Sequence, residues 1–263
     1  MYRAADSQDA LNKRIYHAPG VDTRYKSWEL NRCEAVTLLK HQSAFAGRDV
    51  LDLGVGTGRT TIYLAPLARS YHAIDYSPVM VARAKANLPG ISVRLGDLRD
   101  LSAFADSSLD MVFASNNVYD AVSHEDRARA FAEAHRVLRD GGHLLFSSHN
   151  RSYRDALSGP KLETSANPVR QAVHLVRWIR SLANARRIRH MHRAEADYSL
   201  LSDEGHAYSA LHYYIDHTVQ RRRLRALGFR VVEVLDTLGQ SRAEADPSID
   251  SPWLMYVARR EAS

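Results

Sequence analysis

A short apolar run followed at once by three closely spaced glycines constrains the fold of this chain more than any other feature. Residues 50–58 read Val-Leu-Asp-Leu-Gly-Val-Gly-Thr-Gly. Residues 48–53 are predicted to form a buried strand, because their apolar side chains leave no polar face. A tight glycine turn between a strand and a helix lets a ligand approach the backbone at the carboxyl edge of a parallel sheet. The segment therefore predicts a nucleoside-binding α/β domain.

Apolar runs that suit strands alternate with helical patterns through most of the chain. Strands are expected at residues 48–53, 70–75, 91–95, 109–115, 143–148, 229–236 and 253–258, and helices at residues 59–68, 124–138, 168–190 and 218–227. Ser77 and Pro78 mark the start of a further helix, as N-cap and first-turn residue. The alternation predicts a Rossmann-like α/β fold with a doubly wound sheet of seven strands.

Residues 151–215 break this alternation, and we expect them to form a mostly helical insertion between the fifth and sixth strands. Four parts follow along the chain. They are an N-terminal helical cap at 1–46, a nucleoside-binding core at 47–150, an inserted substrate cap at 151–215, and residues 216–263, which complete the core sheet. The glycine turn lies in the core, where a parallel sheet places its ligands.

The composition narrows the partners only slightly. The 263 residues carry a formal net charge of +6, with 13 histidines and one cysteine. The single cysteine, Cys33, permits neither an internal disulfide nor a cysteine metal cluster, and the scattered histidines predict no metal site. The basic charge favours anionic ligands without choosing between nucleic acid, membrane and phosphorylated metabolite. Residues 1–6 lack the apolar stretch of a signal peptide and no run is long enough to span a membrane, so we expect a cytoplasmic protein.

Three aspartates fall near the ends of predicted strands. Asp75 follows Gly54 by about 20 residues, the spacing at which an acidic residue accepts hydrogen bonds from the ribose hydroxyls. Asp52 lies in the first strand and Asp97 closes the third, where it would reach an adenine amino group. The glycines are spaced G-x-G-x-G, unlike the G-x-G-x-x-G of nicotinamide-dependent oxidoreductases. For Asp52 and Asp97 the alternative role is the capping of strand ends.

Several stretches match one family in order and spacing, at residues 50–58, 73–80, 96–98 and 136–142. With them the chain resembles the class I S-adenosylmethionine-dependent methyltransferases. Ser-His-Asn at 148–150 and Leu-His-Tyr-Tyr-Ile at 211–215 resemble segments of bacterial members that act on small molecules. The resemblance implies a Rossmann-like fold, S-adenosylmethionine as cofactor, and residues 47–150 as the core that binds it.

The resemblance also implies individual cofactor contacts. At the methionine end these are Asp52, Gly54, Gly56, Gly58 and Asn116, with Tyr25 and Arg32 of the N-terminal segment as candidates for the carboxylate. At the nucleoside end they are Asp75 for the ribose, and Tyr76, Met80, Asp97 and Leu98 for the adenine. Tyr25 and Arg32 rest on no motif, and a surface or packing role is the alternative for both.

The catalytic residues are harder to identify. Methyl transfer from a sulfonium is an in-line displacement, so alignment and exclusion of water supply most of the acceleration. A base is needed only where the acceptor must lose a proton. Candidates on the loops after the fourth and fifth strands and in the insertion are Tyr119, His124, His149 and Tyr213. His149 is the best placed, directly after the fifth strand, as a base or a residue that positions the acceptor; a plain hydrogen-bonding role is the alternative. Helix capping is the alternative for His124, and Tyr213 would belong to an aromatic wall around the acceptor.

The helix expected at residues 168–190 carries an apolar stripe and many arginines. Three uses compete. The helix would be a lid whose arginines grasp a phosphate or carboxylate, a surface that lies on an anionic membrane or RNA, or a solvated face whose stripe packs on the core.

These features predict a methyltransferase that acts on an oxygen or nitrogen of a small metabolite. The sequence allows an anionic acceptor and a homodimer but decides neither. One alternative is an RNA methyltransferase that uses the basic insertion. Residues 115–118 read Ser-Asn-Asn-Val where methyltransferases of bases carry Asn-Pro-Pro-Tyr, which argues against nucleic acid as substrate. Another alternative is a non-catalytic protein that only binds the cofactor.

Overall fold

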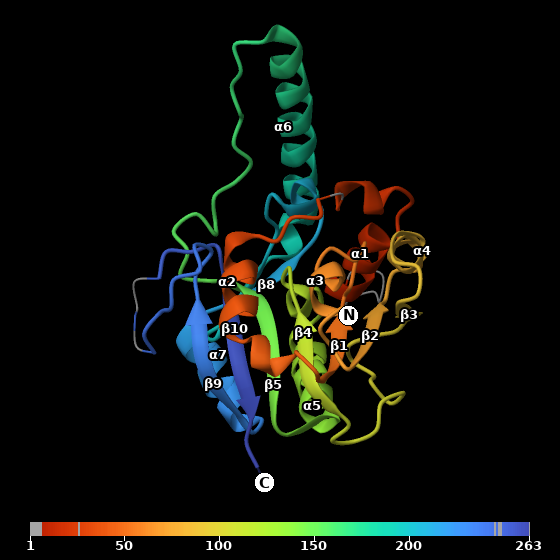
Figure 1. The fold of residues 1–263 in the computed structure, drawn as a ribbon. Helices are drawn as coiled ribbons and strands as arrows, with labels where there is room; N and C mark the ends of the chain where they lie inside the picture. Colours follow the sequence, from red (N-terminus) through yellow and green to blue (C-terminus); the bar gives the residue numbers. More distant parts are fainter. Residues whose placement is uncertain (1–6, 26, 245, 247–248, 263) are drawn as a thin grey trace.

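A single sheet organises the computed structural model, which describes residues 7–25, 27–244, 246 and 249–262 (Figure 1). Its central path runs β3 (Ser92–Leu95), β2 (Ser70–Asp75), β1 (Asp49–Leu53), β4 (Leu109–Ala114), β5 (Leu138–Asn150), β10 (Trp253–Arg260) and β9 (Phe229–Leu235). The first five strands are parallel, and β10 is antiparallel to both of its neighbours. This order confirms the predicted Rossmann-like α/β fold.

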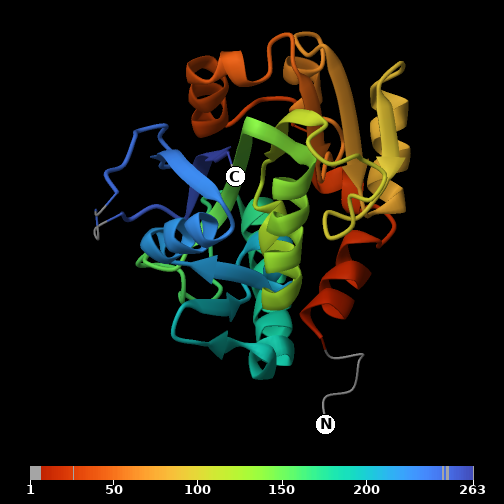
Figure 2. The same cartoon turned by 90° about the horizontal axis from the view of Figure 1, so that it is seen from below.

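Helices cover both faces of this sheet. They are α1 (Gln8–Tyr16), α2 (Arg32–Lys40), α3 (Thr61–Leu64), α4 (Pro78–Asn87), α5 (His124–Val137), α6 (Pro168–Ile188) and α7 (His217–Ala226). Short 3-10 turns are η2 (Val21–Arg24), η3 (Gln42–Ala44), η4 (Val118–Ala121), η5 (Arg189–Met191) and η6 (Gly205–Tyr208). Residues of α5 and α7 share one apolar cluster with the sheet, and residues of α2 and α3 share another, so these pairs lie on opposite faces (Figure 2).

Two predicted elements differ from the structure around the core. The helix expected at 59–68 shrinks to α3, because its β-branched residues favour helix weakly and Pro66 stops it. The fifth strand is longer than expected: α5 ends at Val137, and β5 begins at the next residue, with Gly141 in a left-handed conformation inside it. At the carboxyl end the strand gains two residues, His149 and Asn150, which lie past the end of β4 and pair with the insertion.

The insertion is not mostly helical, which corrects the prediction. Besides α6 it contains β6 (Arg193–Ala194), β7 (Tyr198–Leu201) and β8 (His212–Ile215), so the sheet has ten strands instead of seven. Their aromatic and apolar residues pair in an antiparallel ladder that helical periodicity could not reveal. His149 pairs with Trp253 of β10 on one edge and with Tyr214 of β8 on the other. The insertion therefore occupies the edge of β5 that β4 leaves free.

Helix α6 projects from the body of the molecule, and residues 158–167 run back along it (Figure 1). Among its residues only Ile188 is buried, whereas Val169 is 72% and Val176 is 66% exposed. The expectation that its apolar stripe packs on the core is therefore wrong. None of the described helices combines the length and the apolar character needed to cross a membrane. The prediction that residues 1–6 form no signal peptide lies outside the described residues.

Candidate active site

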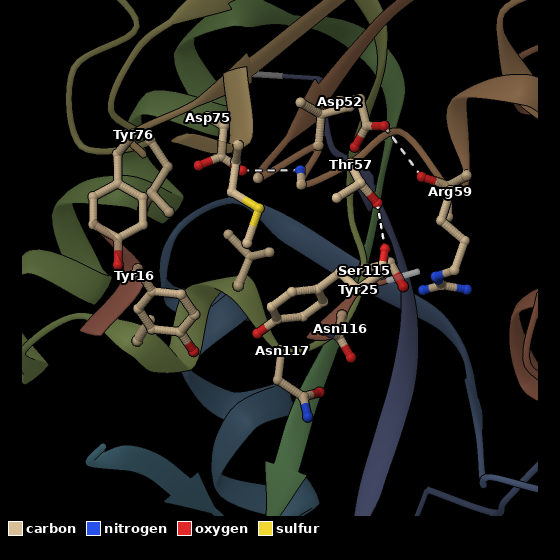
Figure 3. Close-up of a pocket in the computed structure, with 18 of the residues that line it drawn as sticks. Tyr16, Tyr25, Asp52, Thr57, Arg59, Asp75, Tyr76, Ser115, Asn116 and Asn117 are labelled. Carbon is tan, nitrogen blue, oxygen red and sulfur yellow. Dashed lines mark hydrogen bonds between the residues drawn. The ribbon is translucent and has the colours of Figure 1, made fainter. Parts of the chain in front are cut away.

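A cavity of about 570 Å³ opens beside the carboxyl ends of β1, β2 and β4 (Figure 3). Predicted cofactor contacts that line it are Tyr25, Asp52, Gly54, Gly56, Asp75, Tyr76, Met80, Asp97, Leu98 and Asn116. Figure 3 shows Tyr16 and Tyr76 on one side of the cavity and Asp52 and Arg59 on the other. The sheet thus gathers residues from separate strand ends around one space, as the parallel topology requires.

The three glycines of the turn have different tasks. Gly54 has a φ of 67°, and a side chain there would place its Cβ 2.5 Å from Val118 Cγ2. Gly56 faces open space, because its nearest neighbour would be the Gly54 carbonyl oxygen at 4.0 Å. Gly58 does not line the cavity, since its Cβ would meet Leu88 Cδ1 at 2.2 Å. Gly54 and Gly56 leave room for a ligand, whereas Gly58 allows helix α4 to pack closely.

Asp75 is placed as a ribose ligand would require. Its carboxylate accepts hydrogen bonds from the backbone N–H of Gly56 at 2.9 Å and of Ser77 at 2.8 Å. Burial raises the pKa of Asp75 to about 6 despite these two bonds. The hydroxyl of Tyr76 is buried in the same region without a hydrogen-bond partner. An acceptor carboxylate, an unpartnered hydroxyl and the open side of Gly56 together fit a polar nucleoside.

At the opposite end Asp52 is 2% exposed and accepts hydrogen bonds from Tyr71 Oη at 2.5 Å and Thr60 Oγ1 at 3.3 Å. Burial raises the pKa of Asp52 to about 7. A cationic amino group beside this carboxyl would favour its ionised form. Asp52 is therefore a buried acid at the cavity that suits a cationic group of a ligand.

The arginine at this end is Arg59, which the sequence analysis missed. Its guanidinium forms a bidentate pair with Glu34, whose side chain is fully buried, and Ser115 donates to the same carboxylate. The predicted Arg32 is exposed and does not line the cavity, because it follows the N-cap Asn31 on the outer side of α2. The position of Arg59 directly after the last glycine was the signal available in the sequence.

Asp97 lines the cavity, but its carboxylate is already paired. Arg99 Nη2 lies 2.6 Å from Asp97 Oδ2, and Arg99 Nη1 lies 2.9 Å from carboxylate oxygens of both Asp9 and Asp126. Although burial acts in the opposite direction, the Arg99 guanidinium lowers the pKa of Asp97. This ion-pair group fixes the loop after β3, so Asp97 and Leu98 hold a defined position in the cavity wall.

The N-terminal segment closes one side of the cavity with aromatic rings. Thr57 Oγ1 donates to the Tyr25 carbonyl oxygen at 2.7 Å, which ties this segment to the glycine turn. Tyr25 Oη lies 2.9 Å from His206 Nε2, and Tyr16 Oη lies 3.3 Å from His212 Nε2. Both tyrosines therefore connect the cavity to the insertion.

His149 lies one side chain behind the cavity wall. Its Nδ1 lies 2.9 Å from Oδ2 of the fully buried Asp120, and its backbone N–H donates to the same oxygen at 2.6 Å. Because a carboxylate only accepts, Nδ1 carries the proton and Nε2 offers a lone pair. Asn117, which lines the cavity, donates to that Nε2 at 3.1 Å. The arrangement is that of a histidine base oriented by a carboxylate.

A second carboxylate from the insertion approaches the same histidine. Asp203 Oδ2 lies 3.6 Å from His149 Nε2, 2.7 Å from His212 Nδ1 and 2.8 Å from Tyr214 Oη. Burial disfavours the charged form of His212, but Asp203 outweighs it and raises the pKa of His212. One ligand atom from each of His149, Asp203 and His212 lies within 4.8 Å of the others, although each group already has a hydrogen-bond partner. No motif marks Asp203 in the sequence.

The remaining predicted catalytic residues lie away from the cavity, which corrects the prediction. Tyr119 is fully buried and stacks on Phe131 with ring centroids 4.2 Å apart. His124 Nδ1 lies 2.8 Å from Tyr213 Oη, and the ring of Tyr213 covers the guanidinium of Arg127. These side chains join α5 and η4 to the insertion, so their roles are structural.

Known proteins with similar sequences match mainly the core. A family model described as a methyltransferase domain matches residues 50–142. A probable S-adenosylmethionine-dependent methyltransferase of Mycolicibacterium smegmatis is 36% identical over 124 residues, which are 47% of this chain and 45% of that protein. A malonyl-[acyl-carrier protein] O-methyltransferase of Pectobacterium atrosepticum is 30% identical over 142 residues, which are 54% of each protein. The chain spans about half the length of these curated relatives.

Solved structures extend the similarity in fold. Burkholderia thailandensis 1,6-didemethyltoxoflavin-N1-methyltransferase, with bound 1,6-didemethyltoxoflavin and S-adenosylhomocysteine, has a TM-score of 0.61 at 15% identity, covering 100% of this chain and 92% of that one. This likeness supports the Rossmann-like fold. The family match and the sequence relatives identify residues 50–142 as a class I S-adenosylmethionine-dependent methyltransferase domain, whose cofactor is S-adenosylmethionine.

Proposed function

We propose that this chain transfers the methyl group of S-adenosylmethionine to an oxygen or nitrogen of a small acceptor. The observation that carries the proposal is the junction at Asn117, where the cofactor cavity meets the His149–Asp120 pair. Two similar proteins support the choice of atoms, since one is named an O-methyltransferase and the other an N1-methyltransferase. The bound cofactor would supply a methyl group on a positively charged sulfur.

The cofactor would lie along the cavity in one direction. Asp75, Tyr76, Met80 and the loop at 97–98 would hold the adenosine, while Asp52, Arg59 and Asn116 would hold the methionyl part. This assignment follows the two buried carboxyls, Asp52 and Asp75, which lie at the ends of the adjacent strands β1 and β2 and both line the cavity. Arg59 would take the role first expected of Arg32, because Arg59 lines the cavity and Arg32 does not.

His149 would accept the proton that a hydroxyl or ammonium acceptor loses. Asp120 fixes its tautomer and would stabilise the imidazolium, as in other carboxylate–histidine pairs. The Asn117 amide lies between His149 Nε2 and the cavity. Rotation of that amide would expose the base to the cavity. The insertion at 151–215 would then be the substrate cap, since it supplies Asp203 and His212 to the same corner.

Transfer of a labelled methyl group from S-adenosylmethionine, measured over a panel of small hydroxyl and amine acceptors, tests the proposal. We expect His149→Gln to lower kcat by about 10²–10⁴-fold and to remove an ionisation from the pH–rate profile. His174→Gln on α6 is the matched control and should leave the rate unchanged. Cofactor binding without transfer to any acceptor would favour the non-catalytic alternative.

A further inference from the structure

A second hollow, of about 650 Å³, lies at the base of α6. Helix α1, the turn at residues 18–21 and the end of α6 surround it. The arginine hollow, as we call it, is defined by its basic side chains, which are Arg14, Arg24, Arg180, Arg187 and His190. Arg24 also lines the cofactor cavity, so the two spaces share a wall.

The charges of the arginine hollow are uncompensated. No carboxylate of the described residues lines it. With the residues that the structure describes, Arg14, Arg180 and Arg187 form no hydrogen bond or ion pair. Arg24 meets only His206 Nδ1 among them, at 3.2 Å. Burial lowers the pKa of His206 to about 4, so this histidine is neutral at physiological pH. By contrast, Arg99 on the far side of the cofactor cavity meets three aspartates.

The floor of the hollow is apolar. Leu11 and Ile188 are buried there with Leu211, and Ile15 and Met191 pack against them. Guanidinium groups around an apolar floor suit a ligand with an apolar body and an anionic group at its end. Several arginines around one hollow match a phosphate or diphosphate better than a single carboxylate, because each guanidinium can donate two parallel hydrogen bonds and the total charge is higher.

From the shared wall at Arg24 and the unpaired charges, we infer that the arginine hollow binds the phosphate or diphosphate group of the methyl acceptor. This inference rests on the proposed function, because it assigns the acceptor to the class of phosphate esters. The acceptor would lie with its anionic group under α6 and its reactive atom toward the cofactor cavity. Helix α6 would then contribute its basal arginines, and not its projecting tip, to recognition.

Calorimetric titration with inorganic pyrophosphate at constant ionic strength tests the site directly. We expect wild-type protein to bind it, and the double variant Arg180→Gln/Arg187→Gln to bind at least about tenfold more weakly. Arg170→Gln/Arg177→Gln is the matched control, because it removes the same charge from the same helix outside the hollow, and it should change the affinity less than about twofold. Arg24 is left intact because it also lines the cofactor cavity. Absence of binding, or equal loss in both double variants, would overturn the inference.

Two further titrations separate the remaining explanations. S-adenosylhomocysteine should bind wild type and both double variants alike. A protein that binds S-adenosylhomocysteine but not pyrophosphate overturns this inference alone. A protein that binds pyrophosphate but not S-adenosylhomocysteine overturns the proposed function alone. Vesicles of phosphatidylglycerol and phosphatidylcholine test a lipid as the source of the phosphate. Vesicle binding that pyrophosphate displaces, and that only Arg180→Gln/Arg187→Gln weakens, supports the hollow. Vesicle binding lost equally in both double variants, with no pyrophosphate bound, contradicts it.

Discussion

The cofactor side and the acceptor side of this molecule are built in different ways. On the cofactor side, Asp52, Gly54 and Gly56 lie within a few residues of one another, and Asp75 ends the adjacent strand. On the acceptor side, His149 meets Asp120 from an earlier loop and Asp203 from the insertion. The first site is a property of one βαβ unit, whereas the second exists only when distant segments have packed.

The joint between the two sides is the buried ion pair of Arg127 and Asp120. Arg127 donates to Asp120, Ser148 and Gln220, and its guanidinium lies 4.6 Å from the centre of the Tyr213 ring. Helix α5, the η4 turn and the insertion therefore meet at one side chain. Predictions about this joint and about each side separately test whether the two regions differ as described.

The largest effect is expected from Arg127→Met. Removing the guanidinium leaves the fully buried Asp120 carboxylate without its cation, so the free energy of unfolding should fall by about 3–5 kcal/mol. Urea denaturation measures the change. Arg129→Met, on the exposed face of the same helix, should change stability by less than about 0.5 kcal/mol. Equal effects of the two substitutions would show that the Arg127–Asp120 ion pair does not hold the core and the insertion together.

A pair of glycine substitutions compares the two sides directly. Gly54→Ala introduces a side chain at a φ of 67° and against Val118, which should cost about 1–3 kcal/mol of stability and weaken cofactor binding. Gly159→Ala, in the insertion, meets no atom within 4 Å and should be neutral or slightly stabilising. Thermal unfolding with and without S-adenosylhomocysteine separates the effects. Comparable losses at both positions would contradict the close approach of Gly54 to Val118 and the open surroundings of Gly159.

A smaller effect should appear in the pH dependence of cofactor binding. The pKa of Asp75 is raised to about 6, so its contribution to stability is lost as pH rises from about 4 through 6, while the carboxylate that ribose hydroxyls require forms over the same range. The affinity for S-adenosylhomocysteine should therefore fall below pH 6, by up to about tenfold per unit. Asp75→Asn should abolish this dependence, and a remaining ionisation near pH 7 would belong to Asp52. A flat profile in the wild type would be inconsistent with this role.

The contrast between one local βαβ unit and a site assembled from distant segments also explains which residues the sequence could predict. Strand ends, the glycine turn and Asp75 follow local rules, so both their positions and their meeting point were predictable. Asp203 and Tyr16 reach the site through the pairing of β5 with β8 and through packing of α1, which no local pattern encodes. Tyr119 illustrates the opposite error. It lies on the expected loop, but its ring turns into the core and stacks on Phe131.

Titration of the purified protein with S-adenosylhomocysteine tests the central claim most directly. We expect saturable binding at one site, weakened at least about tenfold by Asp75→Ala and unchanged by Asp197→Ala, which removes an acid of the insertion outside the cavity. Failure to bind S-adenosylhomocysteine, or binding that Asp75→Ala leaves intact, would contradict the account of this cavity as the cofactor site.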